Sequence, residues 1–592
     1  MDRTKERPKE TGLAQNAELI RNTYRKAVIT GMLSILSANI NVFVDGILVG
    51  RRIGAEALAA INLSLPVYLA LCVVGSFLAA GTEIPAARAI GIGETTKRDL
   101  YFRTGLNVSV LASLVITLLA LLFRRPLVSF LCADVSTRVF VMQYVVITVI
   151  GALPKIVIYI PFWYLRLDGK NASVTIMMAG MTIVNILLDV LFVYYMDMGM
   201  FGAGLASVIA TALACLYGLI CLFSKGSQFS WRPEIAHGRT AWKSIASAGF
   251  PSAFNNLCST IRLLFVNAML LKYGGAELVA TFTAVNGIWG FGECVTLGVP
   301  ASGGAMLAVF SGESDNGSTR LLLREEWKVG CIAGGVFLVL CAALSGVIPG
   351  MFGLSGSILV PLLWMALSVF PALLLTIIST YYNMASLNGW SNALILLRVL
   401  VMTYVGLQWV ILSRFSTFSF LLFAEVTTVI IWWAATGLHH RRKPQDSRYL
   451  MTDLENERSG KVLNFSVSSD VDEIVDASER ISEFCAMNGM SAKQTMRLQM
   501  SMEEVMTLIR SINEEKGVGD LTFDLRAYSV SGVRGIRIRY NGIPFNPFAH
   551  TVTDDEDDLY MGVRMILKMV EIVNYQSAFG SNTLQIILKE EN

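Results

Sequence analysis

Residues 172–196 read ASVTIMMAGMTIVNILLDVLFVYYM. The stretch holds one charged residue, Asp189, and it is long enough to cross a bilayer as a helix, for which about 20 residues suffice. A charged side chain inside hydrocarbon is costly, so it normally faces the interior of a helix bundle and marks a path for ions or substrate. The stretch therefore predicts a membrane helix that carries a functional group.

Eleven more apolar stretches, most of similar length, lie between about residue 24 and residue 438. Over the whole chain 54% of the residues are hydrophobic and 16% are charged, against about 25% charged in an average soluble protein. This composition excludes a purely soluble enzyme and predicts an all-α polytopic membrane bundle. The twelve predicted transmembrane helices are 26–50, 57–82, 102–123, 138–163, 172–196, 202–224, 244–271, 278–310, 327–349, 357–386, 392–412 and 416–438.

Charges outside these spans predict the orientation. With the N-terminus inside the cell, the short inner loops hold twelve Lys and Arg residues and the outer loops hold seven, which favours this topology. The opening residues MDRTKERPKETG contain no apolar run before a cleavage site, so they are expected to form a cytoplasmic tail. We expect a multi-pass protein of the cell membrane with both termini in the cytoplasm.

Short motifs recur about 220 residues apart. Phe43-Val44-Asp45 aligns with Phe265-Val266-Asn267, and Leu167-Asp168-Gly169 aligns with Leu387-Asn388-Gly389. The repeat predicts two lobes of six helices each, an arrangement typical of transporters that work by alternating access. The predicted parts are a cytoplasmic tail (1–23), an N-lobe (24–224), an interlobe cytoplasmic loop (225–243), a C-lobe (244–438), a basic stop with a linker (439–460) and a C-terminal domain (461–592).

Acidic and amide side chains inside the spans are the candidate site residues. Asp45 lies in the first span, and Asn185 precedes Asp189 by four residues, so these last two share a helix face and can bind one cation. Asn267 is the repeat mate of Asp45, and Glu293 is the C-lobe candidate. A carboxylate in a bundle interior can exchange a proton or Na⁺, as an ion-coupled antiporter requires. The alternative is a structural ion pair, for which the middles of the spans offer only Arg398 and Arg262.

Four stretches resemble the multidrug and toxic compound extrusion (MATE) transporters over about residues 20–440. They are VFVDGILVGRRIGAEALAAINLSLPV (42–67), WYLRLDGKNASV (163–174), NILLDVLFVYYMDMGMFGAGLASVIA (185–210) and ALILLRVL (393–400). The resemblance implies that Asp45, Asn185 and Asp189 form an N-lobe site for H⁺ or Na⁺. It also implies that Tyr144 belongs to this site and that Ser207 stands where a threonine is usual.

Beyond residue 460 the pattern changes to alternating strands and amphipathic helices. We predict strands at 461–469, 521–530, 533–541 and 583–589 and helices at 472–489, 493–515 and 561–573. This order predicts an α+β sandwich with helices on one face of a mixed sheet. Residues 444–592 hold 24 acidic and 15 basic residues, whereas residues 1–443 hold 21 and 33, so the two parts differ in charge.

The C-terminal domain resembles the histidine-kinase-like ATPase fold in its anti-sigma-factor kinase branch. RLQMSMEEV (497–505) is similar to the helix that carries the catalytic glutamate, here Glu504, and YNGIPFNPF (540–548) is similar to the nucleotide-binding box. The resemblance implies a degenerate nucleotide site at Glu504, Asn541, Gly542 and Gly562. Leu508 stands where the family has its magnesium-binding asparagine, and a leucine cannot coordinate the ion. We therefore expect a non-catalytic module.

Together these patterns predict a secondary active transporter rather than an enzyme: a multidrug efflux antiporter that exports organic cations in exchange for H⁺ or Na⁺. The expected partners are the small-molecule substrate, the lipid bilayer and a cytoplasmic protein at the C-terminal domain, with no nucleic acid, no cofactor and no resident metal; we expect a monomer. Nine cysteines without a CxxC pair and four histidines exclude a zinc cluster. Two alternatives remain open: a membrane-tethered signalling protein that senses a ligand, and a flippase for a lipid-linked precursor.

Overall fold

The structure is a computed structural model. It describes residues 17–52, 55–92, 94–131, 135–224, 227–230, 239–348, 358–413, 416–519, 521–530, 532–548, 560–578 and 581–589. The chain divides into two compact units. The membrane unit comprises Tyr24–Asp315 and Leu322–His439; the C-terminal unit is mainly His440–Asn592 and also includes Met1–Thr23 and Asn316–Leu321.

The membrane unit is all-helical, as predicted. The N-lobe contains α1 (Ala17–Arg52), α2 (Ala55–Gly91), α3 (Thr95–Leu122), α4 (Arg124–Leu131), α5 (Val135–Ile150), α6 (Ala152–Val157), α7 (Tyr159–Leu167), α8 (Asn171–Asp189), the π-helix η1 (Val190–Tyr195) and α9 (Gly199–Leu222). The C-lobe contains α10 (Arg239–Thr296), α11 (Gly298–Gly312), α12 (Asn316–Leu344), α14 (Leu359–Met384), α15 (Asn388–Ile395), the π-helix η2 (Leu396–Val401), α16 (Met402–Ser413) and α17 (Ser419–Arg442).

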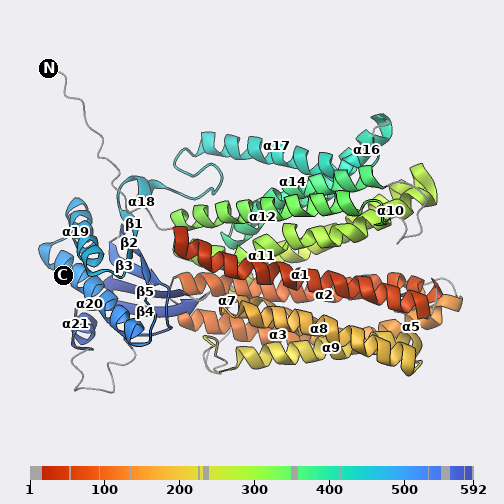
Figure 1. Ribbon diagram of the computed structural model, residues 1–592, viewed down its shortest axis with the longest axis horizontal. Helices are drawn as coiled ribbons and strands as arrows, with labels where there is room; N and C mark the ends of the chain where they lie inside the picture. Colours follow the sequence, from red (N-terminus) through yellow and green to blue (C-terminus); the bar gives the residue numbers. More distant parts are fainter. Residues whose placement is uncertain are drawn as a thin grey trace. The chain divides into compact units, whose positions relative to one another are not determined.

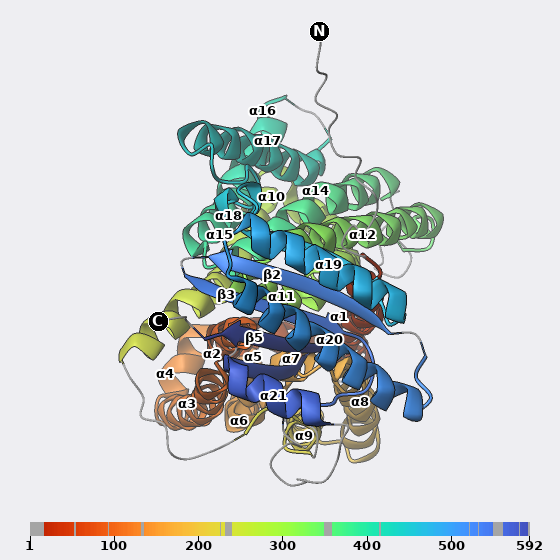
Figure 2. The same cartoon turned by 90° about the vertical axis from the view of Figure 1, so that its left-hand side faces the viewer.

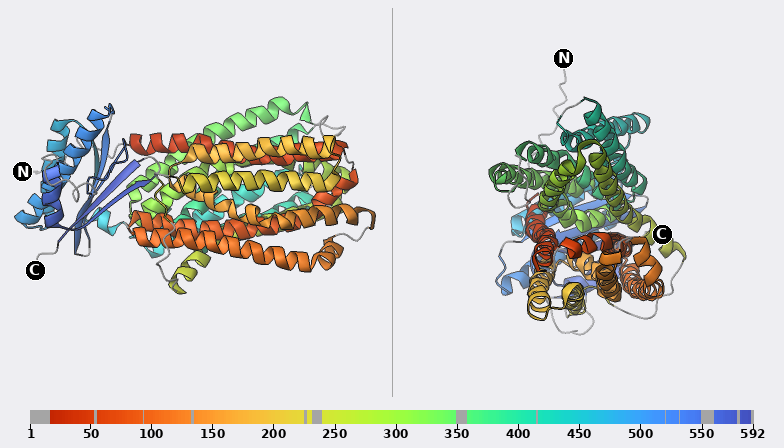
Figure 3. Two further views of the ribbon diagram at one scale, coloured as in Figure 1. Left: turned by 90° about the horizontal axis from the view of Figure 1, so that it is seen from below. Right: turned by 90° about the vertical axis from the view of Figure 1, so that its right-hand side faces the viewer.

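The two lobes occupy opposite halves of this bundle, with α1 and the long helix α10 near the boundary (Figures 1 and 3). Among the described residues nine helices are long and apolar enough to cross a membrane. The number becomes ten if the pair Arg138–Ile150 and Ala152–Leu167, which is bent by 60°, forms one span. Twelve spans and a two-lobe repeat therefore stay predictions.

The largest difference from the predicted spans lies in α10. The sequence predicted one span ending at residue 271 and another starting at 278, but α10 is assigned as helix from Arg239 to Thr296. The segment 272–277, KYGGAE, contains two glycines, which weaken a helix, but no proline that would remove a backbone N–H. The helical hydrogen bonds can therefore continue through it.

The C-terminal unit contains a five-stranded sheet covered on one face by helices (Figure 2). The elements are α18 (Glu455–Arg458), β1 (Val462–Ser468), α19 (Val471–Met487), α20 (Ala492–Glu515), β2 (Thr522–Val530), β3 (Val533–Tyr540), α21 (Met561–Met569), β4 (Val570–Ala578) and β5 (Ser581–Leu588). Alternate strand residues such as Phe523 and Leu525 are fully buried and pack with Leu498 and Met502 of α20. This alternation produces the predicted core between sheet and helices.

Two details of this domain were predicted wrongly. The strand order is β1-β2-β3-β5-β4 and every pairing is antiparallel, so the sheet is not mixed. The predicted helix 561–573 ends at Met569, and residues from Val570 onward form β4. The sequence EIVNY (571–575) contains β-branched and aromatic residues that favour a strand once β5 offers a partner.

Candidate functional site

Helix α8 lies along α1 and is tied to it by side-chain hydrogen bonds. Thr175 Oγ1 donates to the carbonyl of Thr30 over 3.2 Å, Thr182 Oγ1 donates to the carbonyl of Ser37 over 3.0 Å, and Tyr194 donates to the carbonyl of Leu48 over 3.3 Å. The separation along the chain is 145, 145 and 146 residues, so the two segments run parallel in a constant register. This register places Asn185 opposite Asn41.

A polar cluster of Asn41, Asn185, Asp189 and Ser207, called here the Asp189 cluster, joins three helices of the N-lobe. Asn185 Nδ2 donates to Asp189 Oδ2 over 2.7 Å, and Asn41 Nδ2 donates to Asn185 Oδ1 over 3.0 Å. Ser207 Oγ on α9 reaches the same Asn185 oxygen over 3.5 Å, at the outer limit of a hydrogen bond. Asn185 and Asp189 are 2% and 1% exposed, so the predicted pair is confirmed as neighbours in the bundle interior.

The backbone changes its helix type at Asp189. The α-helical part of this span ends there, and the π-helix η1 begins at Val190. A π-turn widens the helix and leaves its carbonyls differently aimed, and such segments occur often at functional sites. The carboxylate therefore stands at a natural point of deformation within the span.

Chemically, the Asp189 cluster offers oxygen ligands that suit either a proton or a small hard cation. A carboxylate and amide or hydroxyl oxygens are the donor types that hard cations prefer. The same carboxylate can instead accept a proton while the amide of Asn185 changes from donor to acceptor. The cluster can thus bind one positive charge at a time.

The other predicted site residues are less closely joined. Tyr144 of α5 packs against α9: its ring lies 3.5 Å from the position that a Cβ on Gly204 of α9 would take. Asp45 belongs to α1, but its side chain lies outside the described residues. Asn267 and Glu293 both lie on α10, and within the described part of the chain neither forms a hydrogen bond with the Asp189 cluster.

Sequence reasoning missed Asn41. The signal was present, since Asn41 precedes Asp45 by four residues just as Asn185 precedes Asp189 by four. What no spacing could supply is the pairing of Asn41 with Asn185, which depends on the register between α1 and α8.

In the C-lobe a partly buried ion pair joins η2 to α17. Arg398 Nε lies 2.9 Å from Glu425 Oε1 and 2.7 Å from Glu425 Oε2, and Arg398 Nη1 donates to Thr376 Oγ1 over 2.8 Å. The side chains of Arg398 and Glu425 are 19% and 9% exposed. The arginine that the sequence placed within a late span is therefore neutralised by one partner.

The lobes contact each other tightly at the end of the bundle where α2 ends. Arg88 Nε and Nη2 donate to the carbonyls of Met384 and Asn383 over 2.6 and 2.7 Å. These carbonyls belong to the last turn of α14, where acceptors lack helical partners. Arg166 Nη1 reaches the carbonyl of Ala301 over 3.3 Å. By the predicted orientation this is the cytoplasmic end, where these three hydrogen bonds join the N-lobe to the C-lobe.

The predicted nucleotide site of the C-terminal unit is packed with apolar side chains. Leu508, Ile512, Phe545 and Val563 form one buried cluster, with Phe548 and Tyr560 packed against it. Burial also raises the pKa of the neighbouring Tyr540, whose hydroxyl donates to the carbonyl of Phe545 over 3.0 Å. The surroundings of Leu508 are therefore mainly apolar.

The four residues predicted for that site have structural roles. Asn541 Oδ1 accepts a hydrogen bond from the backbone N–H of Thr522 over 2.7 Å, so it holds the start of β2. Gly542 has a positive φ of 118°, which favours glycine. Glu504 lies directly against Gly562, where a Cβ would come 2.1 Å from its carboxylate oxygen. The expected loss of catalysis stays a prediction.

The membrane unit is similar to known transport proteins. Residues 31–191 match the MatE family model. Among relatives, the "Multidrug export protein MepA" of Staphylococcus haemolyticus is 24% identical over 254 residues, covering 43% of this chain and 55% of that protein. The "FAD transporter" of Shewanella oneidensis is 24% identical over 234 residues, covering 39% and 52%. The chain thus spans about half the length of these curated relatives.

Solved structures agree with the fold. "Outward-facing conformation of a multidrug resistance MATE family transporter of the MOP superfamily" superposes with a TM-score of 0.66 at 20% identity, covering 73% of this chain and all of that one. A MOP superfamily transporter from Pyrococcus furiosus, described as having "reverse polarity of binding pocket", gives a TM-score of 0.65 at 20% identity and the same coverage. The membrane unit is therefore similar to the MATE transporters: residues 31–191 match the family model, and solved MATE structures share its fold.

Proposed function

We propose that this protein is an antiporter that exports organic cations in exchange for H⁺ or Na⁺, with the C-terminal unit as a regulatory module. The observation that carries the proposal is the Asp189 cluster. In it the buried carboxylate of Asp189 is hydrogen-bonded to the amide of Asn185, directly before the π-helix η1 begins. The names of two relatives, a multidrug export protein and a FAD transporter, support transport of organic molecules.

The mechanism follows from competition for one negative charge. An ion that binds Asp189 from the outside lowers the affinity of this carboxylate for a cationic substrate. The substrate is then released to the outside. Release of the ion to the cytoplasm restores the charge. Coupling requires only that ion and substrate differ in affinity between the two states of the lobes. The interlobe contacts of Arg88 and Arg166 would close the cytoplasmic end in the outward-open state.

The test measures transport of the cationic dye ethidium into inverted membrane vesicles, in which the cytoplasmic face points outward. A proton gradient drives transport in one arm and a sodium gradient in the other. Asp189→Asn keeps the size of the side chain and removes its charge, so ion-driven flux should fall to the level of vesicles without the protein. Asp197→Asn is the matched control, because Asp197 lies eight residues later and its exposed carboxylate pairs with Arg52 over 3.3 Å. Normal flux by Asp189→Asn would refute the proposal.

Regulation is tested by removing residues 444–592. A regulatory module predicts that the truncated protein still couples flux to the ion gradient but with a changed rate. Complete loss of ethidium flux from a correctly inserted truncated protein would instead mean that the C-terminal unit belongs to the transport machinery.

A further inference from the structure

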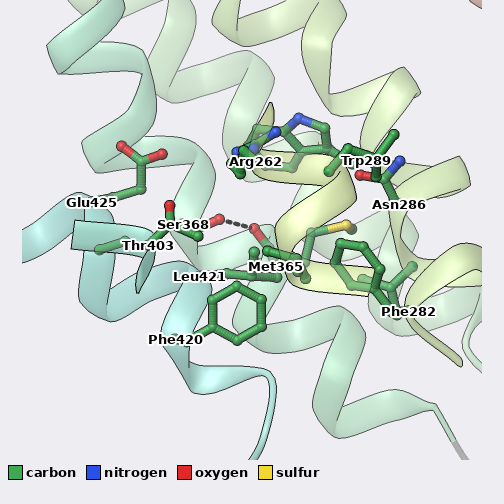
Figure 4. A pocket seen from close by; sticks show the side chains of 14 residues that line it. Arg262, Phe282, Asn286, Trp289, Met365, Ser368, Thr403, Phe420, Leu421 and Glu425 are labelled. Carbon is green, nitrogen blue, oxygen red and sulfur yellow. Dashed lines mark hydrogen bonds between the residues drawn. The ribbon is translucent and has the colours of Figure 1, made fainter. Parts of the chain in front are cut away.

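The C-lobe contains a pocket lined by α10, α14, α16 and α17 (Figure 4). Its volume is about 570 Å³, which includes the part open to solvent. The polar lining residues are Arg262, Asn286, Ser368, Thr403 and Glu425. The pocket is separate from the Asp189 cluster, since it shares no lining residue with it.

Arg262 is the cation of this pocket. It lies within α10 and is half-buried, and it forms no hydrogen bond or ion pair with any residue in the part of the chain that the structure describes. An arginine inside a membrane bundle is costly, and it normally has an acidic partner or serves a ligand or a transport path. The unused donors of Arg262 therefore call for a partner that the described part of the chain does not supply.

The nearby acids do not satisfy it. Glu425 and Glu293 are the acidic groups that act on the charge of Arg262. Glu425, however, is already held by Arg398 through both carboxylate oxygens, and neither acid lies within ion-pair distance of Arg262. Arg398 adds a second positive charge nearby. A guanidinium with its fork of N–H donors unused is suited to bind a carboxylate, sulfonate or phosphate through two parallel hydrogen bonds.

The rest of the lining describes the body of the ligand. Trp289, Phe282 and Phe420 supply aromatic surface, and Met365 and Leu421 supply aliphatic surface. Asn286 contributes an amide, whereas the hydroxyl of Ser368 donates to the carbonyl of Met365 over 2.6 Å and is engaged within the chain. Glu425, the acid of the lining, is paired with Arg398, so a mostly apolar pocket in which Arg262 carries the other charge fits a flat, apolar organic molecule with a single anionic substituent.

We propose that the C-lobe pocket binds the anionic group of an aromatic organic molecule, with Arg262 as its direct ligand and Trp289 beside the ring system. Transport of this molecule across the membrane rests on the proposed function. Its binding to the pocket does not. It gives the protein a second substrate class, organic anions, in addition to the cations expected at the Asp189 cluster.

The experiment measures binding of two dyes to the purified full-length protein in detergent by fluorescence anisotropy. Fluorescein is the anionic probe, and rhodamine 6G is a cationic probe with the same xanthene ring system. Wild type should bind fluorescein, and Arg262→Gln should weaken this binding at least about tenfold while leaving rhodamine 6G unchanged. Arg262→Lys, which keeps the charge but loses the fork, should fall between the two.

Arg324→Gln is the matched control, because Arg324 is exposed on α12 of the same lobe, outside the pocket. The inference is overturned if wild type does not bind fluorescein, or if Arg262→Gln weakens both dyes equally, as a purely structural arginine would. Should Arg262→Gln not fold, the wild-type and Arg262→Lys titrations decide. Ion-driven ethidium flux in vesicles is recorded separately: its absence together with Arg262-dependent fluorescein binding would refute the antiporter and keep this site.

Discussion

Asn185 connects Asp189 to α1: its amide nitrogen donates to the carboxylate over 2.7 Å, while its amide oxygen accepts from Asn41 over 3.0 Å. An amide has distinct donor and acceptor ends. When a proton binds Asp189 at Oδ2, the oxygen that accepts from Asn185, that oxygen becomes a donor, and the Asn185 amide must turn over to accept from it, which breaks the bond to Asn41. The charge on Asp189 is thereby linked to the position of α1.

The link predicts a strong effect at Asn185 itself. Asn185→Leu should reduce ion-driven ethidium flux by at least about tenfold, because both hydrogen bonds are lost and each contributes roughly 0.5–1.5 kcal/mol. The control is Thr182→Val, which removes a different hydrogen bond between α8 and α1, from Thr182 Oγ1 to the carbonyl of Ser37. Equal flux losses in the two variants would mean that helix packing, and not the amide, is what matters.

The ion pair of Arg398 and Glu425 predicts a stability cycle. Arg398→Met leaves a buried carboxylate without its partner and should lower the stability of the purified protein by about 3 kcal/mol. Glu425→Gln in the same chain should recover most of that loss, since the pair is then removed completely. Thermal unfolding of the four proteins in detergent measures the cycle. Additive losses would show that the two side chains do not interact.

Features that depend on residues close together in the chain could be predicted from the sequence, and features that depend on residues far apart in the chain could not. The pairing of Asn185 with Asp189 is local, because a spacing of four places them on one helix face, and it was predicted from the residues alone. The apolar spans gave the helical bundle in the same way. Asn41 needed the register between two helices, and the bonds from Arg88 to α14 join residues about 295 apart, which no periodicity encodes.

The strand β4 illustrates the same limit. Residues 561–573 have a helical pattern of apolar positions, yet the chain leaves the helix at Val570 because β5 provides backbone hydrogen bonds to residues 570–578. Propensity is a weak prior that tertiary pairing overrides. For the same reason the contacts of Arg262, which the sequence placed only within a span, required the surrounding helices to be in place.

The close contact between α2 and α11 predicts that a single bulky side chain at Gly91 will move the two lobes apart. A Cβ on Gly91 would lie 2.3 Å from the carbonyl oxygen of Val309 and 3.1 Å from Cα of Gly312, both of them backbone atoms of α11. Gly91→Leu should therefore force this end of the bundle apart. Spin labels at Lys97 and Lys328, one in each lobe, should report a longer mean distance by pulsed electron paramagnetic resonance.

The matched control for this variant is Gly335→Leu. Nothing lies within 4 Å of a Cβ at Gly335, so the same added side chain should leave the distance unchanged. An unchanged distance in Gly91→Leu as well would indicate that α11 adapts without separation of the lobes, and the proposed closure of this end would lose its support.

In the C-terminal unit Asp524 of β2 is the acid that neutralises two arginines of β3. Arg537 Nη2 lies 3.2 Å and Arg539 Nη1 lies 3.5 Å from Asp524 Oδ2, and all three side chains are at most 4% exposed. Asp524→Asn removes a buried negative charge that lies beside two buried arginines, which should destabilise the unit by roughly 3–5 kcal/mol. Hydrogen exchange of β2 and β3 in the full chain, followed by mass spectrometry, should show correspondingly faster opening.

Glu514→Gln provides the comparison that separates burial from charge. Glu514 pairs with Arg510 over 2.6 Å, but its side chain is 53% exposed, so water already screens the pair. Removing that charge should cost only about 0.3–0.5 kcal/mol. If the two variants exchanged at the same rate, the three buried charges of the sheet would contribute no more than a surface pair, and the packing of the strands alone would have to hold β2 against β3.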